Sequence, residues 1–315
     1  MKAMVITRFG GPEVFEERDI ERPKPGPTEV LVRVHATSVN PVDYKVRQFG
    51  MDGAEPPLVI GYDVSGVVEE VGEAVLLCSP GDEVYYTPEV MPGRGSYAEY
   101  NVADEEIVAR KPANLSHEEA AAIPLAGATA WDALITRGLL TVSETVLIHG
   151  AGGVGSLAIQ IARAAGARVL VVCAGYMVDM ARELGATQAY DYQAADWESA
   201  VIEVTEGTGV DLVLDTVGGD MLARSIAVTK PFGRMAEIVD VDGDLSAAGA
   251  KNMTLHFVTL QRLGYRLNAL RQLIEWGLVR PVIDTVMPLR EVAKAHERIE
   301  AGGVKGKIVL RVSDS

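Results

Sequence analysis

The first third of the chain alternates short apolar runs with turn residues, a pattern typical of β-strands. Glycine and proline clusters, such as those at 10–12 and 80–82, end these runs. Helical periodicity is nearly absent, so this region is expected to form an irregular antiparallel barrel or sandwich. The predicted strands cover residues 3–7, 29–36, 66–71 and 83–86.

The pattern changes near residue 115. Ser116 and Glu119 fit a capping box, in which each side chain satisfies the backbone N–H of the other residue. An alanine-rich helix is expected to follow, with an interruption at Pro124 and a second helical stretch through residue 134.

Apolar strands and amphipathic helices then alternate, which predicts parallel βαβ units in a doubly wound sheet. Strands are predicted over 145–149, 168–173, 189–190, 211–215 and 234–239, and helices over 154–165, 178–184 and 197–206. The remaining predicted elements are a helix (267–276), a strand (282–287), a helix (290–301) and a strand (307–312). The last strand could extend the parallel sheet or return to the first region, and the pattern alone leaves both possibilities open.

The composition indicates two domains without a disulfide framework, since 315 residues exceed a typical single domain. The 29 basic and 44 acidic residues give a net charge of −15, which favours neither a nucleic acid nor an anionic membrane as a partner. The two cysteines, Cys78 and Cys173, fit a cytoplasmic protein. The N-terminus has no signal-peptide pattern, and no apolar run reaches the roughly 20 residues of a membrane span.

A glycine-rich segment between a predicted strand and the following helix matches G-x-G-x-x-G. Gly150 permits a tight turn, Gly152 lets a diphosphate approach the backbone, and Gly155 lets the helix pack closely against the strand. Free N–H groups at the start of the helix favour a bound anion. The segment, which includes Gly153 and Val154, therefore predicts a dinucleotide site. A tight turn without a ligand is the alternative.

The choice of dinucleotide depends on the end of the second strand of this unit. NAD sites usually carry an acid there. The segment 173–178 has no acid, which leaves room for a 2′-phosphate and favours NADPH. The same segment has no Lys or Arg to bind that phosphate, so NADH stays possible.

Several further segments carry a resemblance to a known family. They are NPVDYKVR at 40–47, GYDVSGVV at 61–68, GDEVY at 81–85, GSYAEY at 95–100, AGATA at 126–130, DTVGG at 215–219 and GKIVL at 306–310. With the glycine-rich segment, they resemble the zinc-independent quinone oxidoreductase group of the medium-chain dehydrogenase/reductase superfamily. The resemblance implies an α/β protein with a GroES-like, β-rich catalytic domain (1–120 and 280–315) and a Rossmann doubly wound parallel-sheet domain (121–279), with the cofactor in the cleft between them.

The resemblance also bears on metal binding. Zinc members of the superfamily carry Cys near position 40 and His near position 62, where this chain has Asn40 and Tyr62. The two cysteines and five histidines show no ligand spacing, so no metal site is expected. The reaction implied is reductive: a hydride passes from NADPH to a quinone or to the β-carbon of an activated alkene (an enone).

The resemblance places Asn40, Tyr44 and Tyr62 at the catalytic site. Asn40 can donate a hydrogen bond to a carbonyl or to the nicotinamide ribose, and both tyrosines are candidate donors to a developing oxyanion. Packing without a chemical role is the alternative for each tyrosine.

The resemblance also assigns contacts with the cofactor. Thr129 resembles a residue that touches the nicotinamide side, and Tyr192 resembles one that flanks the adenosine phosphate. Met177 stands where many NADPH-binding members carry Lys, a departure that leaves the cofactor preference open. The remaining predicted cofactor contacts are Ala174, Val217, Gly218, Val239 and Phe257.

Two other functions stay open: an enoyl-thioester reductase of the same architecture, and a non-catalytic structural protein that binds the cofactor. The sixth strand of the Rossmann domain, near 253–258, would expose an apolar edge. Because exposed edges are usually covered or paired, a homodimer joined through this strand is expected.

Overall fold

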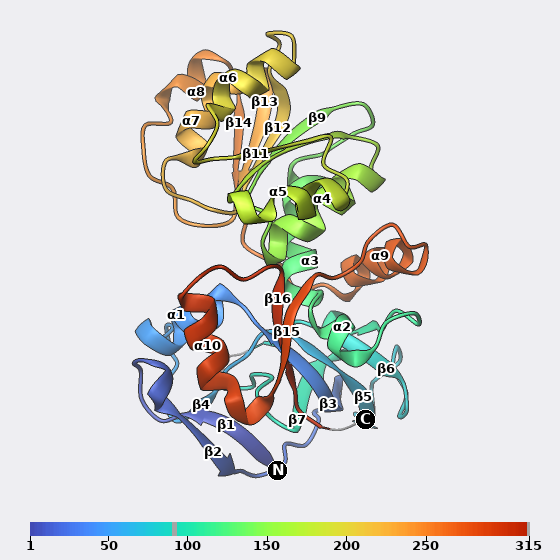
Figure 1. Ribbon diagram of the computed structural model, residues 1–315. Helices are drawn as coiled ribbons and strands as arrows, with labels where there is room; N and C mark the ends of the chain where they lie inside the picture. Colours follow the sequence, from blue (N-terminus) through green and yellow to red (C-terminus); the bar gives the residue numbers. More distant parts are fainter. Residues whose placement is uncertain (90–92, 314–315) are drawn as a thin grey trace. The chain divides into compact units, whose positions relative to one another are not determined.

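The computed structural model describes residues 1–89 and 93–313, and its contacts divide the chain into two compact units (Figure 1). The first unit comprises Met1–Leu125, Arg262–Glu275 and Pro281–Ser315. The second unit comprises Ala126–Gln261 and Trp276–Arg280. Among the described residues, no helix is both long enough and apolar enough to span a membrane.

This division differs from the expected domain boundaries by a few residues, at 121–125 and at 280, and by the segment 262–275, which contains one helix. The expected Rossmann domain includes α9 (Gly264–Glu275), whereas the structure packs α9 against β8 (Ala109–Arg110) and η2 (Glu105–Ile107) of the first unit. A Cβ atom at Gly264 would lie 2.4 Å from the carbonyl oxygen of Val108, so the start of α9 can approach this closely only without a side chain.

Two sheets form the framework of the first unit. The larger sheet has the order β15-β16-β3-β5-β6-β8, with β7 also paired to β3, and the smaller sheet has the order β2-β1-β4. The further strands of this unit are β1 (Lys2–Ile6), β2 (Phe15–Asp19), β3 (Glu29–Val39), β4 (Leu58–Val59), β5 (Val64–Val71), β6 (Glu83–Tyr86), β7 (Tyr100–Asp104), β15 (Ile283–Pro288) and β16 (Lys307–Arg311). The four strands predicted in this region are therefore confirmed, whereas β2, β4, β7 and β8 were not expected.

The strand β16 answers the question that the sequence pattern leaves open. It pairs antiparallel with β3, with Ile308 opposite Val39 and Leu310 opposite Thr37, and parallel with β15. The tail of the chain therefore returns to the first unit. Residues more than two hundred positions apart complete one sheet.

Short helices close the first unit: η1 (Pro12–Val14), α1 (Pro41–Phe49), α2 (His117–Ala121), η5 (Leu289–Glu291) and α10 (Val292–Glu300). The capping box at Ser116 is confirmed, since the Glu119 backbone N–H donates to Ser116 Oγ at 3.2 Å and the Ser116 N–H donates to Glu119 Oε2 at 2.8 Å. The expectation that helices are nearly absent before residue 115 is wrong at α1, because Asn40 and Asp43 form a second capping box and Pro41 fits the first helical position.

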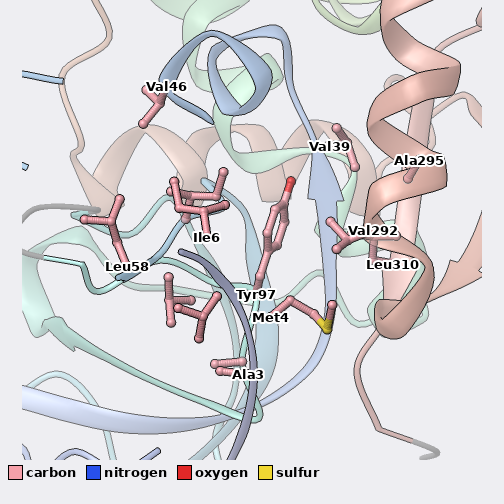
Figure 2. Close-up of a cluster of buried hydrophobic side chains, with 14 of the residues drawn as sticks. Ala3, Met4, Ile6, Val39, Val46, Leu58, Tyr97, Val292, Ala295 and Leu310 are labelled. Atoms are coloured by element: carbon pink, nitrogen blue, oxygen red, sulfur yellow. The ribbon is translucent and has the colours of Figure 1, made fainter. Parts of the chain in front are cut away.

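An apolar core lies between β1 and the elements that surround it. Figure 2 shows its side chains, which come from β1, β3, β4, α1, α10, β16 and the segment before β7: Ala3, Met4, Ile6, Val39, Val46, Leu58, Tyr97, Val292, Ala295 and Leu310. The core binds the tail of the chain to its N-terminal strands, because α10 and β16 supply part of its surface.

The second unit is a six-stranded sheet with the order β11-β10-β9-β12-β13-β14, and every pairing in it is parallel. Its strands are β9 (Thr145–His149), β10 (Arg168–Cys173), β11 (Gln188–Asp191), β12 (Val210–Asp215), β13 (Thr229–Glu237) and β14 (Thr254–Phe257). The predicted doubly wound sheet is confirmed, and the strand expected near 253–258 lies at its edge as β14. A parallel sheet of this kind binds ligands at the carboxyl ends of its strands.

Helices connect these strands: α4 (Gly153–Ala164), α5 (Val178–Glu183), α6 (Trp197–Val204), α7 (Met221–Val228) and α8 (Ser246–Ala250). The predicted helices correspond to α4, α5 and α6, and the structure adds α7 and α8. The helix α3 (Pro124–Trp131) leads into the second unit and continues as the π-helix η3 (Asp132–Arg137).

Candidate active site

The glycine-rich segment forms the turn between β9 and α4. Gly150 has a φ of +89°, and a Cβ atom there would lie 2.5 Å from Thr216 Oγ1. A Cβ atom at Gly155 would lie 2.1 Å from the carbonyl oxygen of Gly150. Both positions therefore exclude any side chain, because the turn and the helix contact each other directly.

Gly152 serves a different purpose in the same turn. A Cβ atom at this position would meet no heavy atom within 4 Å, so the space beside it is open. Gly152 is also the N-cap of α4, and no side chain caps this end of the helix. The segment thus presents open backbone at a helix N-terminus, which fits the diphosphate of a dinucleotide.

Two neighbouring loops lie beside this turn at the same edge of the sheet. Asp215 ends β12, and its Oδ1 accepts hydrogen bonds from the backbone N–H groups of Val217 at 2.8 Å and Gly218 at 3.1 Å. Thr216 Oγ1 donates to the carbonyl oxygen of His149 at 2.7 Å, which ties this loop to the end of β9. The structure therefore brings Val217 and Gly218 to the glycine-rich turn.

The second loop follows β13. Glu237 Oε1 accepts hydrogen bonds from the backbone N–H groups of Ile238 at 3.0 Å and Val239 at 2.9 Å. Phe257 pairs with Glu237 from β14 and is 67% exposed. Val239 and Phe257 thus lie at the ends of adjacent strands, whereas Thr129 lies largely buried in α3.

The expected adenosine side is formed by the ends of β10 and β11. Ala174 follows β10 and caps a short 3-10 helix, in which Met177 is buried. Tyr192 follows β11 and is 47% exposed. A Cβ atom at Gly175 would lie 2.6 Å from Asp191 Oδ2, so a carboxylate from the neighbouring strand lies against this segment. Sequence reasoning missed Asp191, although its place at the end of a predicted strand was a signal.

In the first unit, a buried polar network surrounds Asn40. The Asn40 Nδ2 donates to Asp63 Oδ2 at 2.7 Å, and the Lys307 ammonium donates to Asn40 Oδ1. Lys307 Nζ also lies 3.0 Å from the carbonyl oxygen of Val39 and 3.4 Å from Asp63 Oδ2. Both ends of the Asn40 amide are therefore held, and one N–H of its Nδ2 remains to donate elsewhere.

Asp63 is the acceptor at the centre of this network. Its Oδ2 also accepts from Ser38 Oγ at 2.5 Å, and its Oδ1 accepts from the Leu125 backbone N–H at 2.7 Å. Asp63 and Lys307 are both buried. A buried carboxylate with a cation and several donors is fully satisfied, so the network is rigid.

Asp43 connects Asn40 to a second chain of polar groups. Its Oδ2 accepts from the Asn40 backbone N–H at 2.6 Å and from the Tyr97 hydroxyl at 3.0 Å. Burial raises the pKa of Asp43 to about 7, while the Asn40 hydrogen bond and the Lys307 charge oppose this rise. His296 lies between Tyr97 and Arg47, at 3.2 Å and 3.1 Å.

The two predicted tyrosines lie in different settings. Tyr62 is 2% exposed, and its hydroxyl has no hydrogen-bond partner within the described part of the chain. Burial raises the pKa of this hydroxyl well above its usual value, so it is a proton-bearing donor at neutral pH. The Arg262 guanidinium lies 5.9 Å from the centre of the Tyr62 ring. Tyr44 lies half-buried on α1, the helix that Asn40 caps.

The described residues contain no group of three or more His, Cys, Asp or Glu side chains that could hold a metal ion. Sequence reasoning missed Asp63 and Lys307 as members of the site. The signal was present, because each is a charged residue at the start of an otherwise apolar run.

Comparison with known proteins agrees with this architecture. The family model described as "Alcohol dehydrogenase GroES-like domain" matches residues 26–113, and the model described as "Zinc-binding dehydrogenase" matches residues 184–310. The chain is also 32% identical over 326 residues to a human (Homo sapiens) protein named quinone oxidoreductase, covering 98% of this chain and 97% of that relative. The chain belongs to the quinone oxidoreductase group of the medium-chain dehydrogenase/reductase superfamily.

Other members of the superfamily cover the chain as completely. An Arabidopsis thaliana protein named NADPH-dependent alkenal/one oxidoreductase, chloroplastic, is 34% identical over 322 residues, covering 98% of this chain and 79% of the relative. A crystal structure described as an NAD-dependent alcohol dehydrogenase has a TM-score of 0.92 and 35% identity, covering 99% of this chain and all of that one. This agreement confirms the expected fold class, with a GroES-like first unit and a Rossmann second unit.

Proposed function

We propose that this member of the family is an NAD(P)H-dependent reductase of quinones or activated alkenes that works without a metal. The observation that carries the proposal is the open backbone at Gly152, set between two glycines that exclude side chains. The names of the human and Arabidopsis relatives, a quinone oxidoreductase and an alkenal/one oxidoreductase, support the substrate class.

The second unit would hold the dinucleotide largely through its backbone. The residues proposed for this are Thr129, Gly150, Gly152, Gly153, Val154, Gly155, Ala174, Tyr192, Val217, Gly218, Val239 and Phe257, with Asn40 from the first unit. When bound, the dinucleotide supplies a hydride from its nicotinamide ring. NADPH is the proposed cofactor, and the carboxylate of Asp191 beside Gly175 keeps NADH as the second candidate.

The first unit would act on the substrate oxygen at which negative charge develops. The remaining N–H of Asn40 and the hydroxyls of Tyr44 and Tyr62 are the proposed donors. Asp63 and Lys307 hold the Asn40 amide in one orientation, so this donor needs no rearrangement during the reaction.

The same network supports metal independence. The Asn40 amide oxygen already accepts from the Lys307 ammonium and its nitrogen donates to Asp63, so the amide is not available as a metal ligand. We expect purified protein to contain far less than one zinc ion per chain, and turnover to survive a chelator. Stoichiometric zinc with loss of turnover in the chelator would contradict this part of the proposal.

Turnover tests the reaction directly. We expect oxidation of NADPH in the presence of phenanthrenequinone and of a simple enone. We expect fewer enoyl thioesters than quinones or enones to support turnover. Turnover with an enoyl thioester alone would make the chain an enoyl-thioester reductase. Binding of NADPH with no turnover of any substrate would leave only the structural, cofactor-binding alternative.

A substitution at Gly152 tests the dinucleotide site. Its φ of −73° suits any residue and its surroundings are open, so Gly152→Val should fold normally. The added side chain should block the diphosphate and weaken NADPH binding by about a hundredfold or more, measured by fluorescence titration. Gly249→Val is the matched control. A Cβ atom at Gly249 would also meet open space, but this residue lies in α8 and not in the glycine-rich turn. Equal affinity in both variants would refute the site.

We also propose a cytoplasmic homodimer that pairs through β14 and binds no nucleic acid. The edge position of β14 and the exposed Phe257 support the dimer. The net charge of −15 supports the absence of nucleic acid, and the free Cys78 and Cys173 fit a reducing compartment. Light scattering that gives a monomer at micromolar concentration would rule out the dimer.

A further inference from the structure

Two buried carboxyl groups face each other at the base of the two loops proposed to contact the dinucleotide. Asp215 and Glu237 are directly opposite in the parallel register of β12 and β13. They are 0% and 2% exposed. Adjacent strands lie about 4.8 Å apart, so the two side chains are immediate neighbours.

Each carboxyl group divides its oxygens in the same way. Asp215 Oδ1 holds the Val217 and Gly218 N–H groups, and Glu237 Oε1 holds the N–H groups of the residues that follow it. The other oxygens, Asp215 Oδ2 and Glu237 Oε2, are buried, and no hydrogen bond from another described residue satisfies them. A proton between these two oxygens would satisfy both.

The loops above the pair are joined to each other. The Gly219 N–H donates to the Asp240 carbonyl oxygen at 3.2 Å, and the Asp242 N–H donates to the Gly219 carbonyl oxygen at 2.8 Å. A Cβ atom at Gly218 would lie 2.7 Å from the Asp240 carbonyl oxygen, so the two loops are in direct contact. Any change in the separation of the two carboxyl groups would therefore shift the backbone of both loops.

The elements around the pair supply no cation to it. Burial lowers the pKa of His149 on β9 to about 3 and also lowers that of His256 on β14, so both rings are neutral near pH 7. Arg224 on α7 pairs with Glu198. On the two strands themselves, Lys230 pairs with Asp211, and Arg234 pairs with Glu144. The other charged groups on the packed elements and loops are Asp132, Arg137, Asp220, Asp240 and Asp242.

We propose that Asp215 and Glu237 share one proton and that the protonated pair is a positioning device for the two loops that contact the dinucleotide. This inference rests on the proposed function only for its effect on the cofactor, because the shared proton follows from the geometry. Two adjacent buried carboxylates cannot both ionise without strong repulsion. Each carboxyl group could then keep its loop amides while the proton joins the two strands.

The direction of the pH effect follows from burial and from mutual repulsion. Burial, with the Asp215 charge, raises the pKa of Glu237 to about 8, and burial also raises the pKa of Asp215. The folded pair thus holds a proton that the unfolded chain releases above its ordinary carboxyl pKa near 4.5. Stability is consequently lost as the pH rises from about 4.5 to about 8.

The variant Glu237→Gln tests the shared proton without any cofactor. The amide Nε2 can donate permanently to Asp215, while Oε1 still accepts from the loop N–H groups. We expect the unfolding temperature of the apo wild type to fall as the pH rises from 6 to 9. This fall should exceed that of the variant by about 3 °C or more. Glu203→Gln, an exposed acid on α6, is the matched control and should follow the wild type.

Titration of NADPH against pH tests the positioning role. Wild-type affinity should weaken by about tenfold between pH 7 and pH 9, and Glu237→Gln should keep its affinity over that range. Asp215→Asn is the complementary variant and should give the same flat profiles, which keeps the test valid if one variant fails to fold. Parallel profiles for wild type and both variants would overturn the shared proton. A pH-dependent difference in apo stability without NADPH binding at any pH would support the pair and refute the proposed function.

Discussion

The two units of this protein neutralise buried carboxyl groups by different means. In the first unit, Asp63 lies 3.4 Å from the ammonium of Lys307, a cation that later sequence supplies. In the second unit, Asp215 lies opposite Glu237, which is another acid. An ion pair takes its counter-charge from a side chain, whereas a pair of acids depends on a proton. The comparison teaches that the first unit holds Asp63 with a cation from its own sequence, whereas the proposed proton makes the loops of the second unit sensitive to pH.

The largest expected effect comes from Asp63→Asn. The amide would present N–H groups to Ser38 and to the Lys307 ammonium and would leave that charge without a counter-charge. Loss of one partner of a buried ion pair typically costs about 3–5 kcal/mol of unfolding free energy. Chemical denaturation of the variant measures this cost.

Asp179→Asn is the matched control for that substitution. Asp179 is 92% exposed and pairs with Arg182 only at the surface, at 3.4 Å. Its loss should change stability by less than about 0.5 kcal/mol. Equal effects of the two substitutions would show that the Asp63 pair is not the fixed element of the first unit.

A smaller effect on stability is expected at acidic pH, where two stacked histidines in the first unit would become protonated. The rings of His35 and His117 are 4.5 Å apart, and no hydrogen-bond partner for either His35 nitrogen occurs in the described residues. Burial lowers the pKa of His35, and it lowers that of His117 to about 4. Both rings are neutral in the folded protein. Their contribution to the free energy of unfolding is therefore complete above the ordinary pKa near 6.5 and is lost as the pH falls toward 4.

The variant His35→Phe should keep the stacked ring and remove one of these protonation sites. We expect the variant to match the wild type in unfolding free energy at pH 7 and to exceed it at pH 5, as measured by denaturation at both pH values. A gain at pH 7 as large as that at pH 5 would assign the effect to packing and not to charge.

The smallest effect is expected for Asp215→Asn at neutral pH. The asparagine oxygen can accept from Val217 and Gly218, and its amide can donate to Glu237, so the network stays satisfied. The cost at pH 7 should be within about 1 kcal/mol, well below that of the same change at Asp63. A cost similar to that of Asp63→Asn would remove the distinction between the two units.

Local patterns in the sequence predicted the second unit well. Alternating apolar strands and helices with glycine ends located β9, β10 and α4 to within a residue or so, because a parallel sheet buried on both faces needs continuous apolar strands. The helix α7 was not predicted, since Asp220 gives it no side-chain cap and the preceding segment reads as a turn.

The first unit was harder to predict because long-range pairing determines it. The short strands β4 and β8 have two residues each and exist only through their partners. The helix α1 was not predicted although Asn40, Pro41 and Asp43 are a local start signal, because the surrounding short apolar runs and turn residues are typical of β-strands.

The candidate site was predicted only in part, because some of its contacts also depend on long-range pairing. The glycine-rich turn is a local motif, so its residues could be named from sequence. The contact between Asn40 and Lys307 joins positions 267 apart in the sequence, which no local pattern encodes. The opposition of Asp215 and Glu237 likewise requires the register of two strands.

The return of β16 to β3 has a consequence for protein synthesis. Lys307 follows Asp63 by 244 residues, and the long segment Ala126–Gln261 of the second unit is translated between them. The nucleotide-binding unit can therefore fold while β3 still has an open edge and Asp63 still lacks its cation. A chain that ends before β16 would contain the whole nucleotide-binding unit but an incomplete first unit. The Asn40 network is therefore among the last structures to form.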